Sequence, residues 1–95
     1  MVSFIIRFRF PQEDRAEIAD AVRQLAIESH KEPGCVSYLP NHLEDDPDTV
    51  VILEQYADEK ALAAHRDSAH FKKWCVGVLF QKMKDRAVEN LIAIA

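Results

Sequence analysis

The sequence predicts a single α+β domain over residues 1–95, of the ferredoxin-like split βαβ type. In this fold a βαββαβ chain forms an antiparallel sheet with both helices on one face. Three observations predict it. Strand-like and helical patterns follow one another in the order strand, helix, strand, strand, helix, strand. A chain of 95 residues suits one small domain. With only two glycines and four prolines, the chain has few residues for long loops.

The first strand is expected over residues 2–10, VSFIIRFRF, because alternate side chains there are apolar. One face of this strand carries Val2, Phe4, Ile6, Phe8 and Phe10. Pro11 ends the strand, because proline has no amide hydrogen for the sheet ladder. Residues 12–32 then predict an amphipathic helix. Its apolar stripe is Ile18, Val22, Leu25 and Ser29, flanked by Ala21 and Ala26.

The second strand is expected over residues 35–43, after a Pro33-Gly34 break. Glycine is expected at this break because it accepts a positive φ angle where a helix ends. Pro40 predicts an edge position or a bulge for the strand, because proline donates no ladder hydrogen bond. The acidic residues 44–48 are then expected to form a hairpin turn.

The third strand, residues 49–57, is largely apolar on both faces. Asp58 is expected to cap a short helix, and Asp67 or Ser68 a longer one. The longer helix has apolar residues at helical spacing, namely Phe71, Trp74, Cys75, Val78 and Leu79. Residues 85–95 are expected to form the last strand.

The apolar character of both faces of the third strand, with the phenylalanine-rich face of the first, predicts sheet-on-sheet packing of two chains. The expected assembly is therefore a homodimer. The alternative is a monomer with a few apolar residues on its surface.

The net charge of -4 gives no general attraction to nucleic acid or to an anionic membrane, so neither partner is expected. Arg7 and Arg9 interrupt the apolar N-terminal run, which excludes a spanning helix or signal-peptide core there, and a cytoplasmic protein is expected. Cys35 and Cys75 are expected to be free thiols, because no export signal accompanies them. No metal site is expected, because the cysteines and four histidines show no metal-ligand spacing. His65 and His70, five residues apart, cannot share one helical face.

Three segments resemble the antibiotic biosynthesis monooxygenase (ABM) domain family in order and spacing. They are EPGCVSY (32–38), ILEQYADEKALAAH (52–65) and SAHFKKW (68–74). The spacing is most similar to the quinol monooxygenase and autoinducer-2 processing isomerase branches. The resemblance implies a dimeric α+β barrel with a pocket between each sheet and its helices. It also implies oxidation of a small phenolic or quinol substrate by O2, with no cofactor: no flavin, haem or metal.

Two other functions stay open. One is isomerisation of a phosphorylated keto-sugar, with Arg66, Lys72 or Lys73 holding the phosphate. The other is a non-catalytic dimeric metabolite-binding module. Haem degradation is disfavoured, because the first strand has no asparagine and the long helix has Cys75 and Gly77 where that branch has a histidine.

His65 and Glu54 are the candidate catalytic residues. His65 at the end of the short helix is expected to remove a phenolic proton, and the alternative is an interaction with the helix dipole. Glu54 interrupts an apolar strand face and is expected to orient His65. The alternative for Glu54 is a salt bridge to Arg7 or Arg9 across the sheet.

The candidate substrate-binding residues are Tyr38, Tyr56, His70 and Trp74. The aromatic side chains suit the walls around a planar substrate, although helical spacing favours core packing for Trp74. His70 is expected mainly to order the loop before the long helix. Asn41 and His42 lie near the expected pocket mouth and receive no role.

Overall fold

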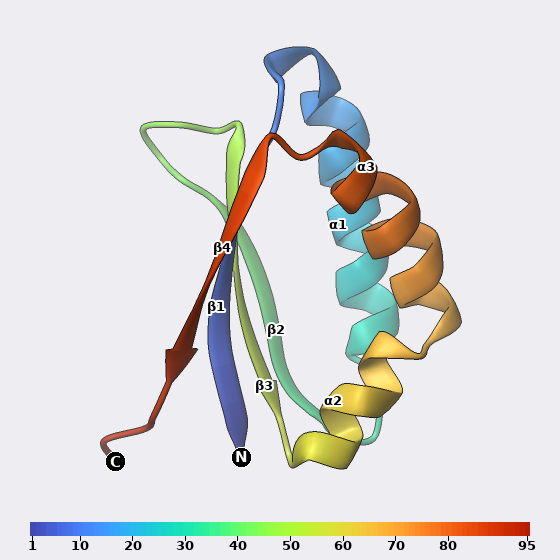
Figure 1. Ribbon diagram of the computed structural model, residues 1–95, viewed down its shortest axis with the longest axis vertical. Helices are drawn as coiled ribbons and strands as arrows, with labels where there is room; N and C mark the ends of the chain where they lie inside the picture. The colour runs from blue at the N-terminus through green and yellow to red at the C-terminus, as the bar shows by residue number, and fades with distance from the viewer.

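The four expected strands form one antiparallel sheet (Figure 1). The computed structural model describes residues 1–95. Its strands are β1 (Val2–Arg9), β2 (Cys35–His42), β3 (Thr49–Tyr56) and β4 (Asp85–Leu91). The spatial order is β2-β3-β1-β4, and each neighbouring pair is antiparallel. This order and the one-sided helix layer confirm the ferredoxin-like α+β fold.

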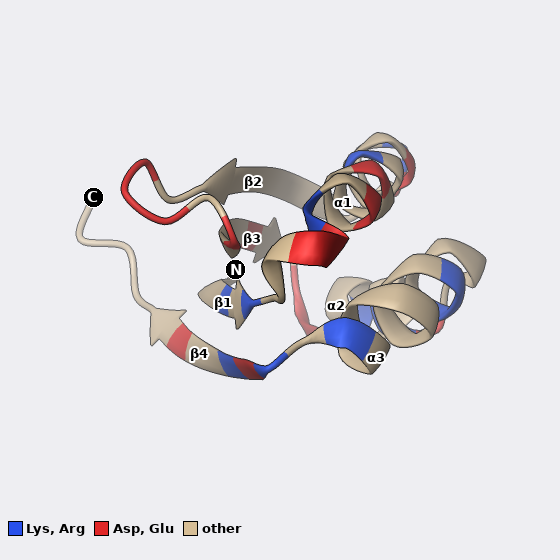
Figure 2. Cartoon of the chain, turned by 90° about the horizontal axis from the view of Figure 1, so that it is seen from above, with Lys and Arg blue, Asp and Glu red and all other residues tan.

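All the helices lie on one face of the sheet, as Figures 1 and 2 show from two directions. They are the 3-10 turn η1 (Gln12–Asp14), α1 (Arg15–Ser29), α2 (Glu59–Arg66), η2 (Phe71–Leu79) and α3 (Phe80–Lys82). None of them is both long enough and apolar enough to cross a lipid bilayer.

The helix that follows α2 differs from the regular α-helix that the sequence predicts. The segment η2 is π-helical, and the amide after it, on Phe80, donates to the carbonyl of Cys75 five residues earlier. The predicted caps are present in part. Asp58 accepts a hydrogen bond from the amide of Ala61 at 2.8 Å, and Ser68, not Asp67, accepts one from the amide of Phe71 at 3.1 Å.

The main core lies between the sheet and the helices, and β1 presents its phenylalanine-rich face to it. The cluster contains Ile6, Phe8, Phe10, Ile18, Ala21, Val22, Leu25, Tyr38, Val50, Ile52, Cys75 and Leu79. The stripe predicted on α1 is buried as expected. The phenylalanines of β1 therefore cannot form the face on which a second chain packs, and that part of the dimer argument is wrong.

The opposite face of the sheet, called the open face below, carries no helix (Figure 2). Its centre is an apolar row in which Leu39, Leu53 and Ile5 stand side by side on β2, β3 and β1. Leu39 is 51% exposed in the single chain, which is a high fraction for leucine in a strand. The open face thus leaves an apolar row partly exposed in the single chain.

Pro40 lies in β2, an edge strand, which confirms the position expected for proline. The irregularity in the β2–β3 ladder is not at Pro40 but between Cys35 and Ser37. Gly34 has no positive φ angle, contrary to expectation. Its role is a close approach to α2, because a Cβ atom on Gly34 would lie 2.3 Å from the Cβ of Ala61.

Replacing Gly34 with alanine should lower the free energy of unfolding by about 1–3 kcal/mol, because the added methyl group overlaps Ala61. Urea denaturation measures the loss. Gly77→Ala is the matched control, because its Cβ would meet only the Lys72 carbonyl at 3.4 Å, an ordinary contact. That control should be neutral or slightly stabilising. Equal losses of stability in Gly34→Ala and Gly77→Ala would contradict the steric explanation. Adding Ala61→Gly to the Gly34→Ala variant should restore part of the lost stability, because it removes the methyl group that overlaps.

Candidate active site

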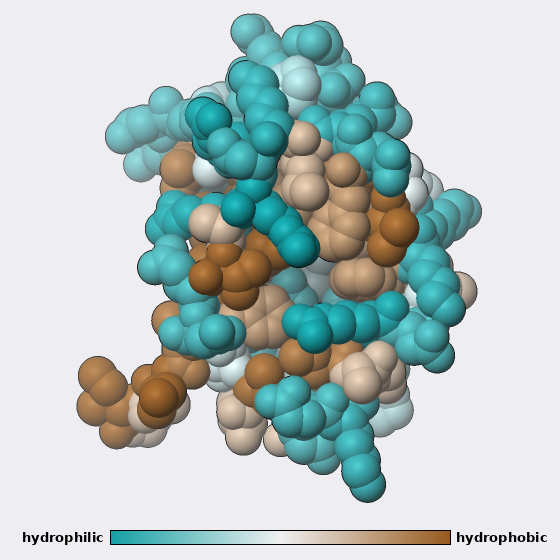
Figure 3. Space-filling model, viewed as in Figure 1, coloured by the Kyte–Doolittle hydropathy of each residue, from teal (hydrophilic) through white to brown (hydrophobic).

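A cavity of about 300 Å³ lies between the helix-facing side of the sheet and the helices α2 and η2. Most of its lining residues are apolar, and they come from all four strands and from α2, η2 and α3. Figure 3, which has the same view as Figure 1, shows a hollow near the centre of the molecule, with hydrophobic walls and hydrophilic side chains across its rim. The polar groups that line the cavity include Tyr38, Glu54, His65, Arg66, Arg86 and Asn90.

His65 is buried at the end of α2, with 2% of its surface exposed. Its Nδ1 lies 2.8 Å from Oε2 of Glu32. A carboxylate only accepts hydrogen bonds, so Nδ1 carries the hydrogen and Nε2 keeps its lone pair. Nε2 lies 3.7 Å from Oε1 of Glu54, too far for a direct hydrogen bond. The carboxylate of Glu32 therefore fixes the tautomer that leaves a basic nitrogen beside Glu54, and both groups line the cavity.

Glu32 also binds His70, so two histidines share one carboxylate oxygen. Nε2 of His70 lies 2.5 Å from the same Oε2 atom. Glu32 comes from the turn before β2, and His70 from the first residues of the helix that continues into η2. The break between α2 and that helix lets both histidines approach Glu32, although they do not share a helical face. The hydroxyl of Ser68 tightens this break by donating to the His65 carbonyl at 2.6 Å.

Glu32, His65 and His70 are also the residues of this chain best placed to hold a metal ion. Their potential ligand atoms all lie within 4.8 Å of one another. Hydrogen bonds to Oε2 of Glu32 already engage one nitrogen of each histidine and account for the grouping. The sequence did not predict this arrangement, because it offered no metal-ligand spacing.

Glu54 is buried on β3 and is held by its neighbour Tyr56, whose hydroxyl donates to Oε1 at 2.6 Å. Burial raises the pKa of Glu54 to about 7, and the charge of Glu32 acts in the same direction. The hydrogen bond from Tyr56 and the charge of Arg66 partly oppose this rise in pKa. At neutral pH the Glu54 carboxyl therefore exchanges readily between its protonated and ionised forms.

The alternative salt bridges of Glu54 are absent. Arg7 pairs with Glu89 at 3.2 Å, and Arg9 pairs with Asp85 at 2.7 Å, both on the neighbouring strand β4. Glu54 faces the helices, on the other side of the sheet. Glu54 therefore has no partner in Arg7 or Arg9, and within the cavity it lies beside the ring of His65.

Burial lowers the pKa of His65, and the hydrogen bond and charge of Glu32 oppose that fall only in part. The imidazole is therefore neutral at pH 7 and able to accept a proton. Burial has the opposite effect on the Cys75 thiol in the cavity wall, whose pKa it raises to about 12. Cys75 is thus a thiol, not a nucleophilic thiolate.

The expected aromatic residues take different positions. Tyr38 lines the cavity, whereas Tyr56 is fully buried behind it, with its ring centroid 5.0 Å from that of His65. Trp74 packs against the core and does not line the cavity. Phe71 packs against the core and also lines the cavity, where its ring meets the His65 ring edge-on with 5.3 Å between the centroids. His70 contacts Glu32, which in turn contacts His65, and His70 is not among the residues that line the cavity.

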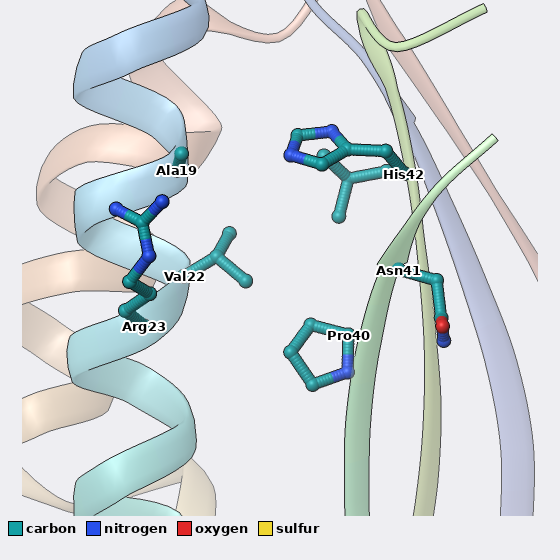
Figure 4. Close-up of a pocket in the computed structure, with 7 residues that line it drawn as sticks. Ala19, Val22, Arg23, Pro40, Asn41 and His42 are labelled. Carbon is teal, nitrogen blue, oxygen red and sulfur yellow. The ribbon is translucent and has the colours of Figure 1, made fainter. Parts of the chain in front are cut away.

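Asn41 and His42 lie at a second cavity of about 200 Å³, between α1 and β2 (Figure 4). Figure 4 shows the Asn41 side chain turned away from α1, and its amide donates to the Leu39 carbonyl at 3.1 Å. Nδ1 of His42 donates to the Pro47 carbonyl at 2.8 Å. Arg23, across the cavity, is paired with Asp20 at 2.9 Å. This cavity lacks the buried acid–base pair of the first.

Replacing Glu54 with glutamine should stabilise the protein at pH 8 relative to the wild type. A carboxyl group whose folded pKa is raised from 4.5 to about 7 favours folding below pH 4.5 and loses that contribution as the pH rises through 7. Between pH 4.5 and pH 8 the unfolding free energy of Glu54→Gln should therefore rise by about 3 kcal/mol relative to that of the wild type. Urea denaturation at pH 4.5 and pH 8 measures this rise, and a difference between variant and wild type that does not change with pH would contradict the raised pKa.

Comparison with known proteins places the chain in a family. Residues 1–76 match the sequence profile described as antibiotic biosynthesis monooxygenase. No curated protein is similar enough in sequence to match. A structure from Nitrosomonas europaea that carries this family name is 25% identical, with a TM-score of 0.92 and 100% of both chains covered. One from Bacteroides thetaiotaomicron with the same family name is 24% identical, with a TM-score of 0.92, covering 99% of this chain and 90% of that one.

A further structure described as an antibiotic biosynthesis monooxygenase has a TM-score of 0.91 and 24% identity, with 100% of both chains covered. At 24% identity, the likeness of the chain to this structure and to the one from Bacteroides thetaiotaomicron shows a shared fold. The sequence match extends over most of the chain, from β1 to the middle of η2, and includes Glu32, Glu54, His65 and His70. The chain therefore belongs to the antibiotic biosynthesis monooxygenase family.

Proposed function

We propose that the protein is a homodimeric monooxygenase that oxidises a small phenolic or quinol substrate with O2, without flavin, haem or metal. The observation that carries the proposal is the His65 imidazole. Glu32 holds its Nδ1 at 2.8 Å, while the unprotonated Nε2 stands beside Glu54 in a largely apolar cavity. This geometry suits removal of a phenolic proton, and the chain's family is named for monooxygenases.

The reaction begins when Nε2 of His65 accepts the proton of a substrate hydroxyl, and Glu32 stabilises the imidazolium that forms. The phenolate then transfers one electron to O2, which yields a substrate radical and superoxide. These recombine to form a carbon–oxygen bond, and His65 returns its proton to the peroxide. Loss of the ring hydrogen as a proton breaks the O–O bond and releases water. In total, a hydroquinone and O2 give a hydroxyquinone and water.

A second candidate function is isomerisation of a phosphorylated keto-sugar, in which His65 and Glu54 move protons without O2. Arg66 favours this candidate, because it lines the cavity and is suited to bind phosphate. Lys72 and Lys73, the other phosphate ligands considered, lie on η2 outside the cavity lining. A third candidate, a metabolite-binding module without catalysis, uses the same cavity.

Oxygen consumption with a panel of hydroquinones tests the proposed function. We expect substrate-dependent uptake of one O2 per product, with one oxygen atom from ¹⁸O2 in the product. Activity on a phosphorylated keto-sugar that persists without O2 would favour the isomerase instead. Thermal stabilisation by a ligand without turnover under either condition would favour the binding module.

The proposed homodimer forms through the open face. The apolar row of Leu39, Leu53 and Ile5 lies at its centre, and charged pairs between β1 and β4 lie beside it. An apolar centre beside a polar rim is typical of protein interfaces. Residues 92–95 extend from the end of β4 away from the helices (Figure 2), and Ile92 and Ile94 are almost fully exposed in the single chain. A second chain on this face would also be in position to cover them.

A further inference from the structure

We propose that Arg66 and Arg86 form a subsite for an anionic group of the substrate, either a carboxylate or a phosphate ester. The inference rests on the proposed function for the position of the reacting hydroxyl at His65. It adds that the substrate is a small acidic compound whose charged group stays at the rim of the cavity.

The two arginines line the same cavity from different parts of the fold. Arg66 follows His65 at the end of α2, and Arg86 is near the start of the edge strand β4. Both are exposed, as groups at a rim must be, whereas His65 and Glu54 are buried. A molecule in the cavity can therefore meet a guanidinium group at its outer end while its inner end contacts His65.

Neither guanidinium group has a carboxylate partner within the chain. The other four arginines all do: Arg7, Arg9, Arg15 and Arg23 each form an ion pair at 3.2 Å or less. The chain has 16 acidic residues against 12 basic ones, so available carboxylates are not scarce. Glu59 also lines the cavity but forms no ion pair with either arginine. The two arginines without partners are thus the two that line the cavity.

Contacts with neighbouring residues support the position of Arg86. Its guanidinium carbon lies 4.9 Å above the ring centroid of Phe80, a cation–π contact. Because Phe80 also lines the cavity, this contact places the charge of Arg86 against the cavity wall. Its hydrogen-bond donors remain free for a ligand.

The chemistry of the cavity limits the ligand class. Its walls are mainly apolar and aromatic, and its volume of about 300 Å³ is at the lower end of the range for ligand sites. A single aromatic ring with a hydroxyl at one end and an oxyanion at the other matches these features. Guanidinium groups bind carboxylate and phosphate oxygens through paired hydrogen bonds.

Calorimetric binding of three ring compounds tests the subsite without turnover. The probes are 4-hydroxybenzoate, phenyl phosphate and the uncharged methyl 4-hydroxybenzoate. The wild type should bind at least one of the two anions about tenfold more tightly than the ester. The preferred anion identifies whether carboxylate or phosphate is the natural group. Equal affinity for the ester and both anions, or no binding of either anion at millimolar concentration, would overturn the proposal.

Arg66→Gln and Arg86→Gln should each weaken anion binding by about tenfold and leave ester binding unchanged. Lys72→Gln is the matched control, because it removes one positive charge outside the cavity, where Lys72 pairs with Asp67 at 3.1 Å. Both arginines are exposed, so the variants should keep the wild-type melting temperature. Anion affinities equal to that of Lys72→Gln would also overturn the subsite. This test measures binding and not turnover. If the protein consumes no oxygen, the proposed function is refuted, but the binding experiment still decides whether the anion subsite exists.

Discussion

Replacing His65 with glutamine should lower kcat/KM for quinol oxidation by roughly 10²–10⁴-fold, the usual contribution of a general base. Glutamine can still donate a hydrogen bond to Glu32, but it has no basic nitrogen to take the substrate's proton. Without the phenolate, electron transfer to O2 loses its driving force. Oxygen uptake at several substrate concentrations separates this loss in kcat from a change in binding.

His42→Gln is the matched control, because His42 is the histidine of the second cavity and its Nδ1 is bound to the Pro47 carbonyl. The oxygen uptake of His42→Gln should equal that of the wild type. Glu32→Gln should have a smaller effect than His65→Gln, about 10–100-fold, because it keeps the base but removes its charged partner. It should also move the acidic limb of the pH–rate profile lower, since Glu32 raises the pKa of His65. Wild-type oxygen uptake by His65→Gln would refute His65 as the base.

The elements of the fold could be predicted because each is encoded within a short window. The alternation in β1 and the apolar stripe of α1 are local patterns, and both appear where the sequence indicates. The π-helical winding of η2 could not be predicted, because the spacing of its apolar residues is the one expected for an ordinary α-helix. Nor could alternation alone say which face of β1 meets the helices, since Ile5 makes its other face partly apolar as well.

The candidate site was predicted only in part, because its central contact joins distant segments. His65 and Glu54 are recognisable as a histidine at a helix end and a carboxylate on an apolar strand face. Glu32 is not, because it lies in a polar turn, 33 residues before His65. Its place directly before Pro33-Gly34, within the segment that resembles the family, was the one available signal. Arg86 carried no comparable signal, since it is one of several charged residues near the start of β4.

The proposed dimer gives the second large effect, which is expected at Leu53. This residue is at the centre of the open face, between Leu39 and Ile5 in adjacent strands. A glutamate there would place a charge in the middle of an apolar interface, where its cross-strand neighbours Leu39 and Ile5 cannot pair with it. The wild type should have twice the 10.9 kDa mass of one chain at micromolar concentration in analytical ultracentrifugation. Leu53→Glu should be monomeric there, with association weakened on the order of 10³-fold.

The Leu53→Glu variant needs a control for the added negative charge, and Gln24→Glu supplies it. Gln24 is exposed on α1, in the helix layer on the other side of the sheet from the open face. This variant should stay dimeric, because it adds the same charge away from the interface. Leu53 points away from the helices, so Leu53→Glu should keep its core and its circular dichroism spectrum while it loses the partner. A wild type of single-chain mass, or dimers in both variants, would mean that the open face is not the interface and that its apolar row has another purpose.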